Sequence, residues 1–224
     1  IIYNHAGSMW CINAFADILN RGEGRPMKAK TLRTCWMPFE EFRAEYSGEP
    51  FGVLYSGENN DFKELPMRVS THLAVYLLHA AWPKEGSHFL LTRPGRYRTY
   101  DYTARPTYAL WQAFENLPYN SETRRFMYYS SEVPRAVQTV PGSLLSSAFV
   151  NSDSTEALVV ISNLDRKKIK EAKVRFDLQV LGFSNSQTVR VEDAILETSL
   201  PMSSSTVSVD IPPERYRLLR VLRR

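Results

Sequence analysis

Cysteine is scarce in this sequence, with only Cys11 and Cys35 among its 224 residues. Two cysteines cannot build the disulfide framework of a small secreted scaffold, although they could pair with each other. Neither lies in a Cys or His pattern with the spacing of zinc ligands, and His72 and His79 lack a carboxylate or third ligand nearby. We therefore expect no metal site.

The motifs of several reaction classes are missing as well. The sequence contains no Gly-rich phosphate loop, no dinucleotide fingerprint, no Gly-x-Ser-x-Gly elbow and no Cys/His nucleophile pair. Nucleotide-dependent chemistry and nucleophilic serine or cysteine chemistry are disfavoured. We expect no cofactor.

Long apolar runs are also absent. No stretch approaches the roughly 20 apolar residues that cross a bilayer, and no signal peptide stands at the start, so we expect no membrane partner. The chain opens on the apolar Ile1 and Ile2 without an initiator methionine or a polar leader. We expect a missing N-terminal region of the same protein, or a partner chain, to complete the fold that begins here.

Charge of one sign does not dominate: 28 Lys and Arg stand against 24 Asp and Glu, a formal net charge of +4. The densest basic runs lie in residues 166–170 and at the terminal Arg220, Arg223 and Arg224. A solvated turn and a solvated tail explain them better than a phosphate-binding patch, and no RNA- or DNA-binding motif accompanies them. We expect no nucleic-acid partner.

Apolar residues make up 43% of the chain and charged residues 23%, so the chain can bury a core. Its length exceeds the commonest domain size of about 100–150 residues, and we expect two domains, residues 1–140 and 141–224. The first alternates short apolar runs with helical patterns, which is typical of α/β order. Its candidate strands are residues 1–4, leading to His5, and residues 15–19 and 51–56.

Two amphipathic helices are predicted in the same part of the chain. Asn60 or Asp61 can cap the first, in which apolar residues recur at spacings of three and four as far as Ala80. The second begins near Pro106 and stops before Pro118.

After residues 141–142 the apolar period changes from near 3.6 to 2. Six segments have strand length, are rich in β-branched residues and are separated by turn residues: 144–150, 157–163, 172–180, 188–194, 206–211 and 215–222. Residues 206–211 alternate strictly between apolar and polar, as a half-buried antiparallel strand demands. The pattern predicts an antiparallel β-sandwich.

The closing passage carries a resemblance. Val189–Leu196, a Ser-rich turn, Val207–Pro213 and Tyr216–Val221 are similar to the C-terminal β-sandwich of many (β/α)8-barrel glycoside hydrolases. Upstream, the strand ending in His5, the Arg-Gly-Glu-Gly run 21–24 and the strand 51–55 look like the C-terminal half of a barrel from bacterial glycoside-hydrolase-like proteins. The resemblance implies the C-terminal part of a (β/α)8 (TIM) barrel followed by an antiparallel β-sandwich, an α/β plus all-β chain.

Glycoside hydrolysis generally uses two carboxyl groups, which in a barrel sit at the C-terminal ends of strands. Glu23, Glu58 and Asp17 are the candidate catalytic residues, because each stands close to a predicted strand. Each also has a plainer interpretation: Glu23 as a solvated turn residue, Glu58 as a loop residue or helix cap, and Asp17 as half of an internal ion pair.

Four further residues are candidates for binding a sugar. His5 and Asn59 could hydrogen-bond hydroxyl groups, and Trp10 and Tyr55 could stack on the apolar face of a sugar ring. A structural histidine and buried core aromatics are the alternatives.

The expected partner is a carbohydrate, a poly- or oligosaccharide. Because large glycans are met outside the cytoplasm, the presumed substrate implies an extracellular or periplasmic location. A non-catalytic carbohydrate-binding or structural protein, or one chain of an obligate assembly, is the alternative.

Overall fold

The computed structural model divides the chain into two compact units, Ile1–Arg105 and Pro106–Arg224. The second unit begins earlier than the boundary expected at residue 140, because two strands upstream of that residue pair with strands downstream of it. The residues that the structure describes are 3–5, 18–20, 74, 77–79, 112–114, 124–127, 129, 135–183 and 189–223.

In the first unit, strands β1 (Tyr3–His5) and β2 (Ile18–Asn20) form a parallel pair in which His5 lies opposite Asn20. Parallel neighbours need a crossover of about a dozen residues or more, and residues 6–17 connect these two. Both strands overlap the segments predicted from the sequence. A parallel pair is what an α/β order requires.

The described helical residues of the first unit are Ala74 and the short 3-10 helix η2 (Leu77–His79). Ala74, Leu77 and Leu78 are fully buried, and of these Leu77 belongs to the apolar face predicted for the helix that ends near Ala80. The predicted cap of this helix and the strand predicted at residues 51–56 lie outside the described residues.

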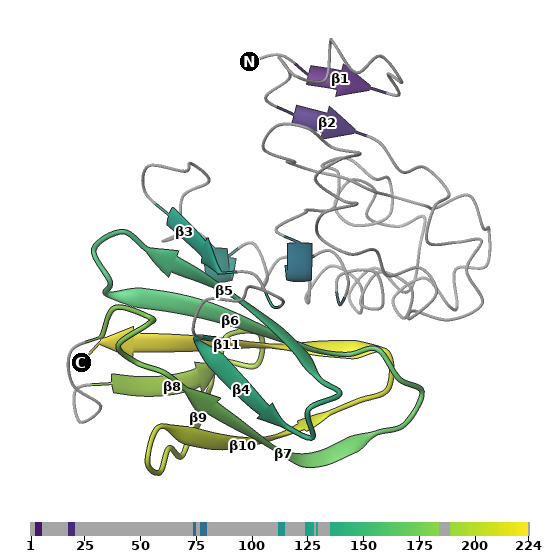
Figure 1. The fold of residues 1–224 in the computed structure, drawn as a ribbon, viewed down its shortest axis with the longest axis vertical. Helices are drawn as coiled ribbons and strands as arrows, with labels where there is room; N and C mark the ends of the chain where they lie inside the picture. The colour runs from purple at the N-terminus through teal and green to yellow at the C-terminus, as the bar shows by residue number, and fades with distance from the viewer. Residues whose placement is uncertain are drawn as a thin grey trace, which may run out of the picture. The chain divides into compact units, whose positions relative to one another are not determined.

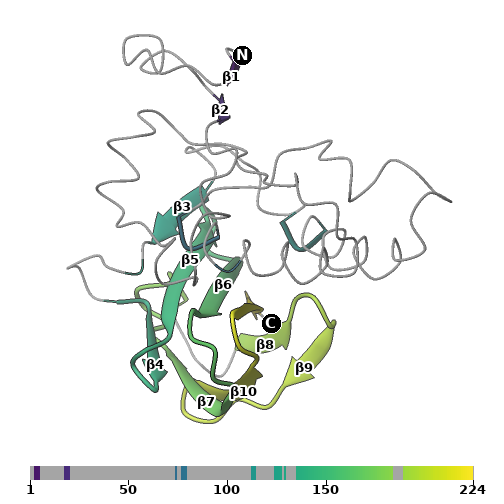
Figure 2. The same cartoon turned by 90° about the vertical axis from the view of Figure 1, so that its right-hand side faces the viewer.

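The second unit contains two antiparallel sheets, seen side-on in Figure 1 and end-on in Figure 2. The larger sheet has the order β3 (Arg124–Met127), β5 (Leu145–Asn151), β6 (Glu156–Asn163), β11 (Arg215–Arg223), β8 (Val189–Asp193) and β9 (Thr198–Leu200). The smaller sheet has the order β10 (Thr206–Ile211), β7 (Ile169–Phe176) and β4 (Val137–Val140). The predicted antiparallel β-sandwich is confirmed.

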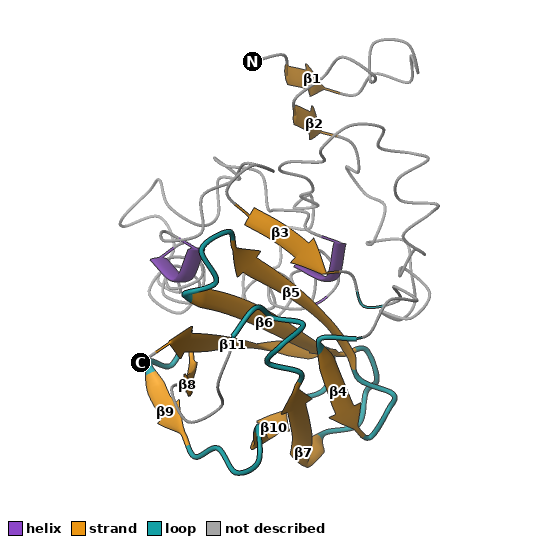
Figure 3. Ribbon diagram, turned by 60° about the vertical axis from the view of Figure 1, so that its left-hand side comes forward, coloured by secondary structure: helices purple, strands orange, loops and turns teal. Residues whose placement is uncertain are grey.

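All six predicted sandwich strands are present, and residues 206–211 match β10 at both ends. The structure adds β3, β4 and β9, each of only three or four residues. Such short strands carry too few residues for a period-2 pattern to stand out, so the sequence did not predict them. Figure 3 shows β3 and β9 at the two edges of the larger sheet.

The sandwich core lies between the two sheets. Alternate residues of a strand point to the same face, and the inner face of each sheet is apolar and buried. The smaller sheet contributes Val174, Phe176 and Ile211, all at most 2% exposed. The larger sheet contributes a second set to the same cluster, including Val159, Ile161, Leu219 and Val221.

Strand β6 is buried on both faces, since every one of its residues is buried. Val159 and Ile161 face the core. Leu158 and Val160, which are also fully buried, alternate with them and face the opposite side. A strand of an ordinary two-layer sandwich would be polar on that side. The larger sheet is therefore a middle layer with something packed on its outer face.

The core predicts a large cost for truncation at its centre. Replacing Ile161, which is 0% exposed, by alanine should lower the free energy of unfolding by about 2–5 kcal/mol, because it removes buried methyl groups and leaves a cavity. Leu196→Ala is the matched control, since Leu196 is 57% exposed, and should change the value by less than about 0.5 kcal/mol. Urea unfolding of the two variants compares them; equal effects would contradict this description of the core.

Candidate functional site

The outer face of the larger sheet has an aromatic centre. Phe114, in the helical residues 112–114, meets Phe149 of β5 edge-to-face, with ring centroids 5.0 Å apart and planes at 87°. Phe126 of β3 lies beside the same ring at 5.0 Å. Buried aromatic contacts of this kind add to the burial of their area. Residues 112–114 therefore pack on this face of the sheet.

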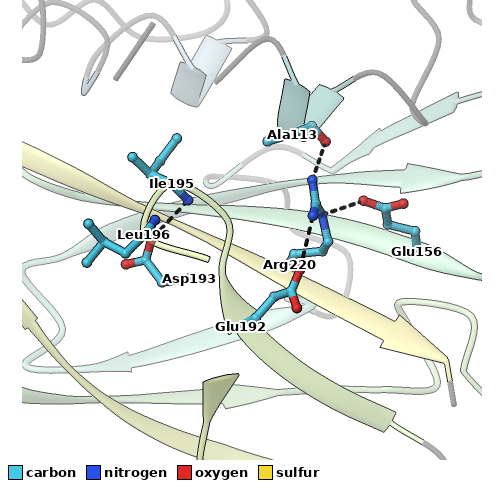
Figure 4. Close-up of polar contacts among 7 residues, drawn as sticks. All are labelled: Ala113, Glu156, Glu192, Asp193, Ile195, Leu196 and Arg220. Atoms are coloured by element: carbon cyan, nitrogen blue, oxygen red, sulfur yellow. Dashed lines mark hydrogen bonds and ion pairs between the residues drawn. The ribbon is translucent and has the colours of Figure 1, made fainter. Parts of the chain in front are cut away.

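Arg220 of β11 lies on the same face and joins three elements (Figure 4). Its Nε is 2.9 Å from Glu156 Oε1 of β6, and its Nη1 donates to Glu192 Oε1 of β8 at 3.0 Å. Its Nη2 donates to the carbonyl oxygen of Ala113 at 3.2 Å. The Glu156 contact is an ion pair without the alignment of a good hydrogen bond. We call Glu156, Arg220 and Glu192 the charge cluster.

Burial makes the charge cluster sensitive to its balance of charge. The Glu156, Arg220 and Glu192 side chains are 6%, 18% and 20% exposed, and two carboxylates surround a single guanidinium. Burial raises the pKa of the Glu156 carboxyl, an effect that Arg220 opposes and Glu192 reinforces. With both glutamates ionised, the cluster carries one uncompensated negative charge.

This finding corrects the prediction for the terminal basic run. Arg220 is part of strand β11 and its side chain is largely buried, so it is not in a solvated tail. The signal was present in the sequence: Arg220 interrupts the apolar run Leu218-Leu219-Arg220-Val221, and a charge in a buried strand needs a partner. Glu156 and Glu192 are distant in sequence, so no spacing rule points to them.

A second arginine of β11 ties the two sheets together. Arg217 Nε donates to the carbonyl oxygen of Asp210 in β10 at 2.8 Å, and its Nη1 donates to Asp193 Oδ2 at 3.3 Å. Asp193 Oδ1 in turn accepts hydrogen bonds from the amides of Ile195 and Leu196 (Figure 4). A partly buried polar bridge therefore connects the two sheets on this side of the sandwich.

The opposite side of the sandwich has a cleft of about 270 Å³ between β4 and β5. Its described lining includes Tyr129, Arg135, Thr139 and Ser146 over an apolar floor, and it contains no carboxylate or histidine. In the described part of the chain, no group of His, Cys, Asp or Glu is arranged to hold a metal ion.

The predicted catalytic and binding residues fall almost entirely outside the described residues. This applies to Glu23, Glu58, Asp17, Trp10, Tyr55 and Asn59. His5 is the exception: its backbone ends β1, at the carboxyl edge of the parallel pair. None of the described helices has the length and apolarity to span a membrane.

Residues 142–217 match the protein-family model described as GLGE, C-terminal. The chain is similar to the C-terminal part of glycoside-hydrolase-like proteins. The predicted resemblance is confirmed at this level. The family match covers β5 to β10 and the first residues of β11, and so includes most of the passage that carried the resemblance in the sequence. No curated protein sequence matches the chain.

Solved structures show the same fold at low sequence identity. The maltogenic α-amylase AmyB of Thermotoga neapolitana matches with a TM-score of 0.53 and 10% identity over 99% of this chain and 55% of its own. The α-galactosidase I of Mortierella vinacea matches with 0.53 and 11% over 95% and 55%. The α-amylase of Geobacillus thermoleovorans matches with 0.53 and 11% over 98% and 52%. The chain spans about half the length of these proteins.

The charge cluster predicts a strong effect of its arginine on stability. Arg220→Met should cost about 3–5 kcal/mol in the free energy of unfolding, because it leaves two buried carboxylates without a cation. Lys168→Met is the control, since the Lys168–Asp210 pair of 2.8 Å is about half exposed, and should cost at most about 1 kcal/mol.

The triple variant Glu156→Gln/Arg220→Met/Glu192→Gln separates charge imbalance from lost packing. It removes all three charges together, so most of the stability should return. Urea unfolding measures all three proteins. A cost for Arg220→Met no larger than for Lys168→Met would contradict the role assigned to the cluster.

Proposed function

We propose that the chain is the C-terminal portion of a glycoside hydrolase, in which the end of a (β/α)8 barrel is followed by the β-sandwich. The observation that carries the proposal is the fold similarity to the two α-amylases and the α-galactosidase, which extends over 95–99% of this chain and so includes both units. The parallel pair β1–β2 in the first unit and the sandwich in the second support the same order.

The substrate class follows from these relatives and from the residues. The relatives' names refer to amylases and a galactosidase, and the proposed substrate of this chain is likewise a poly- or oligosaccharide. In a barrel the chemistry takes place at the carboxyl ends of the strands. Here β1 reaches that edge at its last residue, His5, and β2 reaches it at Asn20. Such a substrate also favours a location outside the cytoplasm.

Chain order ranks the candidate carboxylates. Glu23 follows the last residue of β2 by three positions, on the connection that leaves the carboxyl edge. Asp17 directly precedes β2, at the amino end of the strand, where in a barrel a charged side chain serves stability more readily than chemistry. Glu58 follows the strand predicted at residues 51–56. We therefore assign Glu23 and Glu58 to the acid and the base or nucleophile, with Asp17 as the weaker candidate.

The proposed binding residues complete the site. His5, at the end of β1, and Asn59 would hydrogen-bond sugar hydroxyls, and Trp10 and Tyr55 would stack on the ring. Two carboxyl groups about 5–5.5 Å apart would give retention of configuration, and a wider separation inversion.

Conservative substitutions test the assignment. Glu23→Gln and Glu58→Gln, made in the full-length protein that contains this chain, should each reduce hydrolysis of an α-glucan or an α-galactoside by about 10²–10⁴-fold, since each removes a proton-transferring or nucleophilic group. The readout is the release of reducing sugar.

Glu45→Gln is the matched control, because Glu45 stands six residues before the strand predicted at residues 51–56, on its amino side, and it should leave hydrolysis unchanged. Unchanged activity in both test variants would remove these residues from the mechanism. Measurable glycan binding without turnover in the unmodified protein would favour a non-catalytic carbohydrate-binding protein instead.

A further inference from the structure

Arg220 is the described side chain that links residues 112–114 to two strands of the sandwich by polar contacts. Its guanidinium reaches the Ala113 carbonyl on one side and two carboxylates on the other. Residues 112–114 contribute this carbonyl and the Phe114 ring but no charged side chain. The strength of this contact therefore depends on the balance of charge around the guanidinium.

The charges around Glu156 are unbalanced. Strand β11 contributes Arg220, β8 contributes Glu192, and the turn before β6 contributes the exposed Asp153. Arg190 shares a face of β8 with Glu192 but is exposed. Among the residues that the structure describes, two buried carboxylates and one buried guanidinium leave one negative charge in excess, and a buried charge without a partner is costly.

We propose that the charge cluster is a proton-sensitive clamp: when Glu156 takes up one proton, Arg220 and Glu192 become a balanced pair and residues 112–114 are held more tightly on the sheet. The group that binds the proton is the Glu156 carboxylate, and the proton comes from solvent. No residue of the proposed catalytic site takes part, so the inference stands apart from the proposed function.

The direction of the pH effect follows from linkage. Burial raises the pKa of Glu156 above its ordinary value of 4.5, so the folded chain binds this proton more tightly than the unfolded chain does. Stability from this group is fully present below pH 4.5 and is lost as the pH rises through the raised pKa. The contact of Arg220 with residues 112–114 should therefore be tighter in mild acid than at neutral pH.

Two glutamine variants and a control test the clamp. As the pH falls from about 7.5 to about 5, the Tm of the unmodified chain should rise relative to that of Glu156→Gln, which has no proton to bind. Glu192→Gln removes the neighbouring carboxylate that reinforces the effect of burial on Glu156, so the same rise should be smaller. Lys168→Gln, on the smaller sheet, should retain the full rise.

Hydrogen exchange shows whether the effect reaches residues 112–114. After correction for the intrinsic pH dependence of exchange, the amides of residues 112–114 should be several-fold better protected at the lower pH in the unmodified chain, and equally protected at both in Glu156→Gln. An identical pH response of Tm in these two proteins would overturn proton uptake by Glu156. A Tm rise without added protection of residues 112–114 would overturn the clamp. Neither measurement involves catalysis, so failure here leaves the proposed function to its own test.

Discussion

The burial of the larger sheet on both faces is the constraint on which the second unit depends. One face supplies the core of the sandwich, where it meets the smaller sheet. The other face receives Phe114 and the Ala113 carbonyl, so that the same six strands also hold the segment upstream of them. A sheet used in this way must be apolar on both sides at its centre, and β6 meets this requirement at every residue.

Two arginines of β11, Arg217 and Arg220, enter this arrangement, and each has a backbone carbonyl and a carboxylate as partners. Arg220 and Arg217 stand three residues apart on β11 and therefore point to opposite faces of the sheet. One binds the outer layer and the other binds the inner one. A single strand thus provides polar links to both of its neighbouring layers, while the apolar residues between them supply most of the burial.

Much of the sandwich was predictable from the sequence, since its strands alternate with period 2 between clear turns, and β10 was predicted at both ends. The short strands β3, β4 and β9 were not, because their positions depend on pairing with distant strands and not on their own pattern. The charge cluster was missed for a similar reason: Glu156 and Arg220 come together only when β6 and β11 pair. The catalytic candidates, by contrast, rest on chain order and resemblance, and their geometry lies outside the described residues.

The two open sides of the sandwich are secured unequally. Along β10 and β8, Arg217 crosses from one sheet to the other and binds a backbone carbonyl there. The cleft lies along β4 and β5. There Thr139 Oγ1 donates a hydrogen bond to the carbonyl oxygen of Leu144, which is a local contact at the connection between these two strands. When the two sheets separate transiently, they should do so first along β4 and β5, while the side that Arg217 connects stays together. Water would then reach Val137 and Ala148 before the rest of the core, which makes β4 the first strand of the smaller sheet to lose its protection.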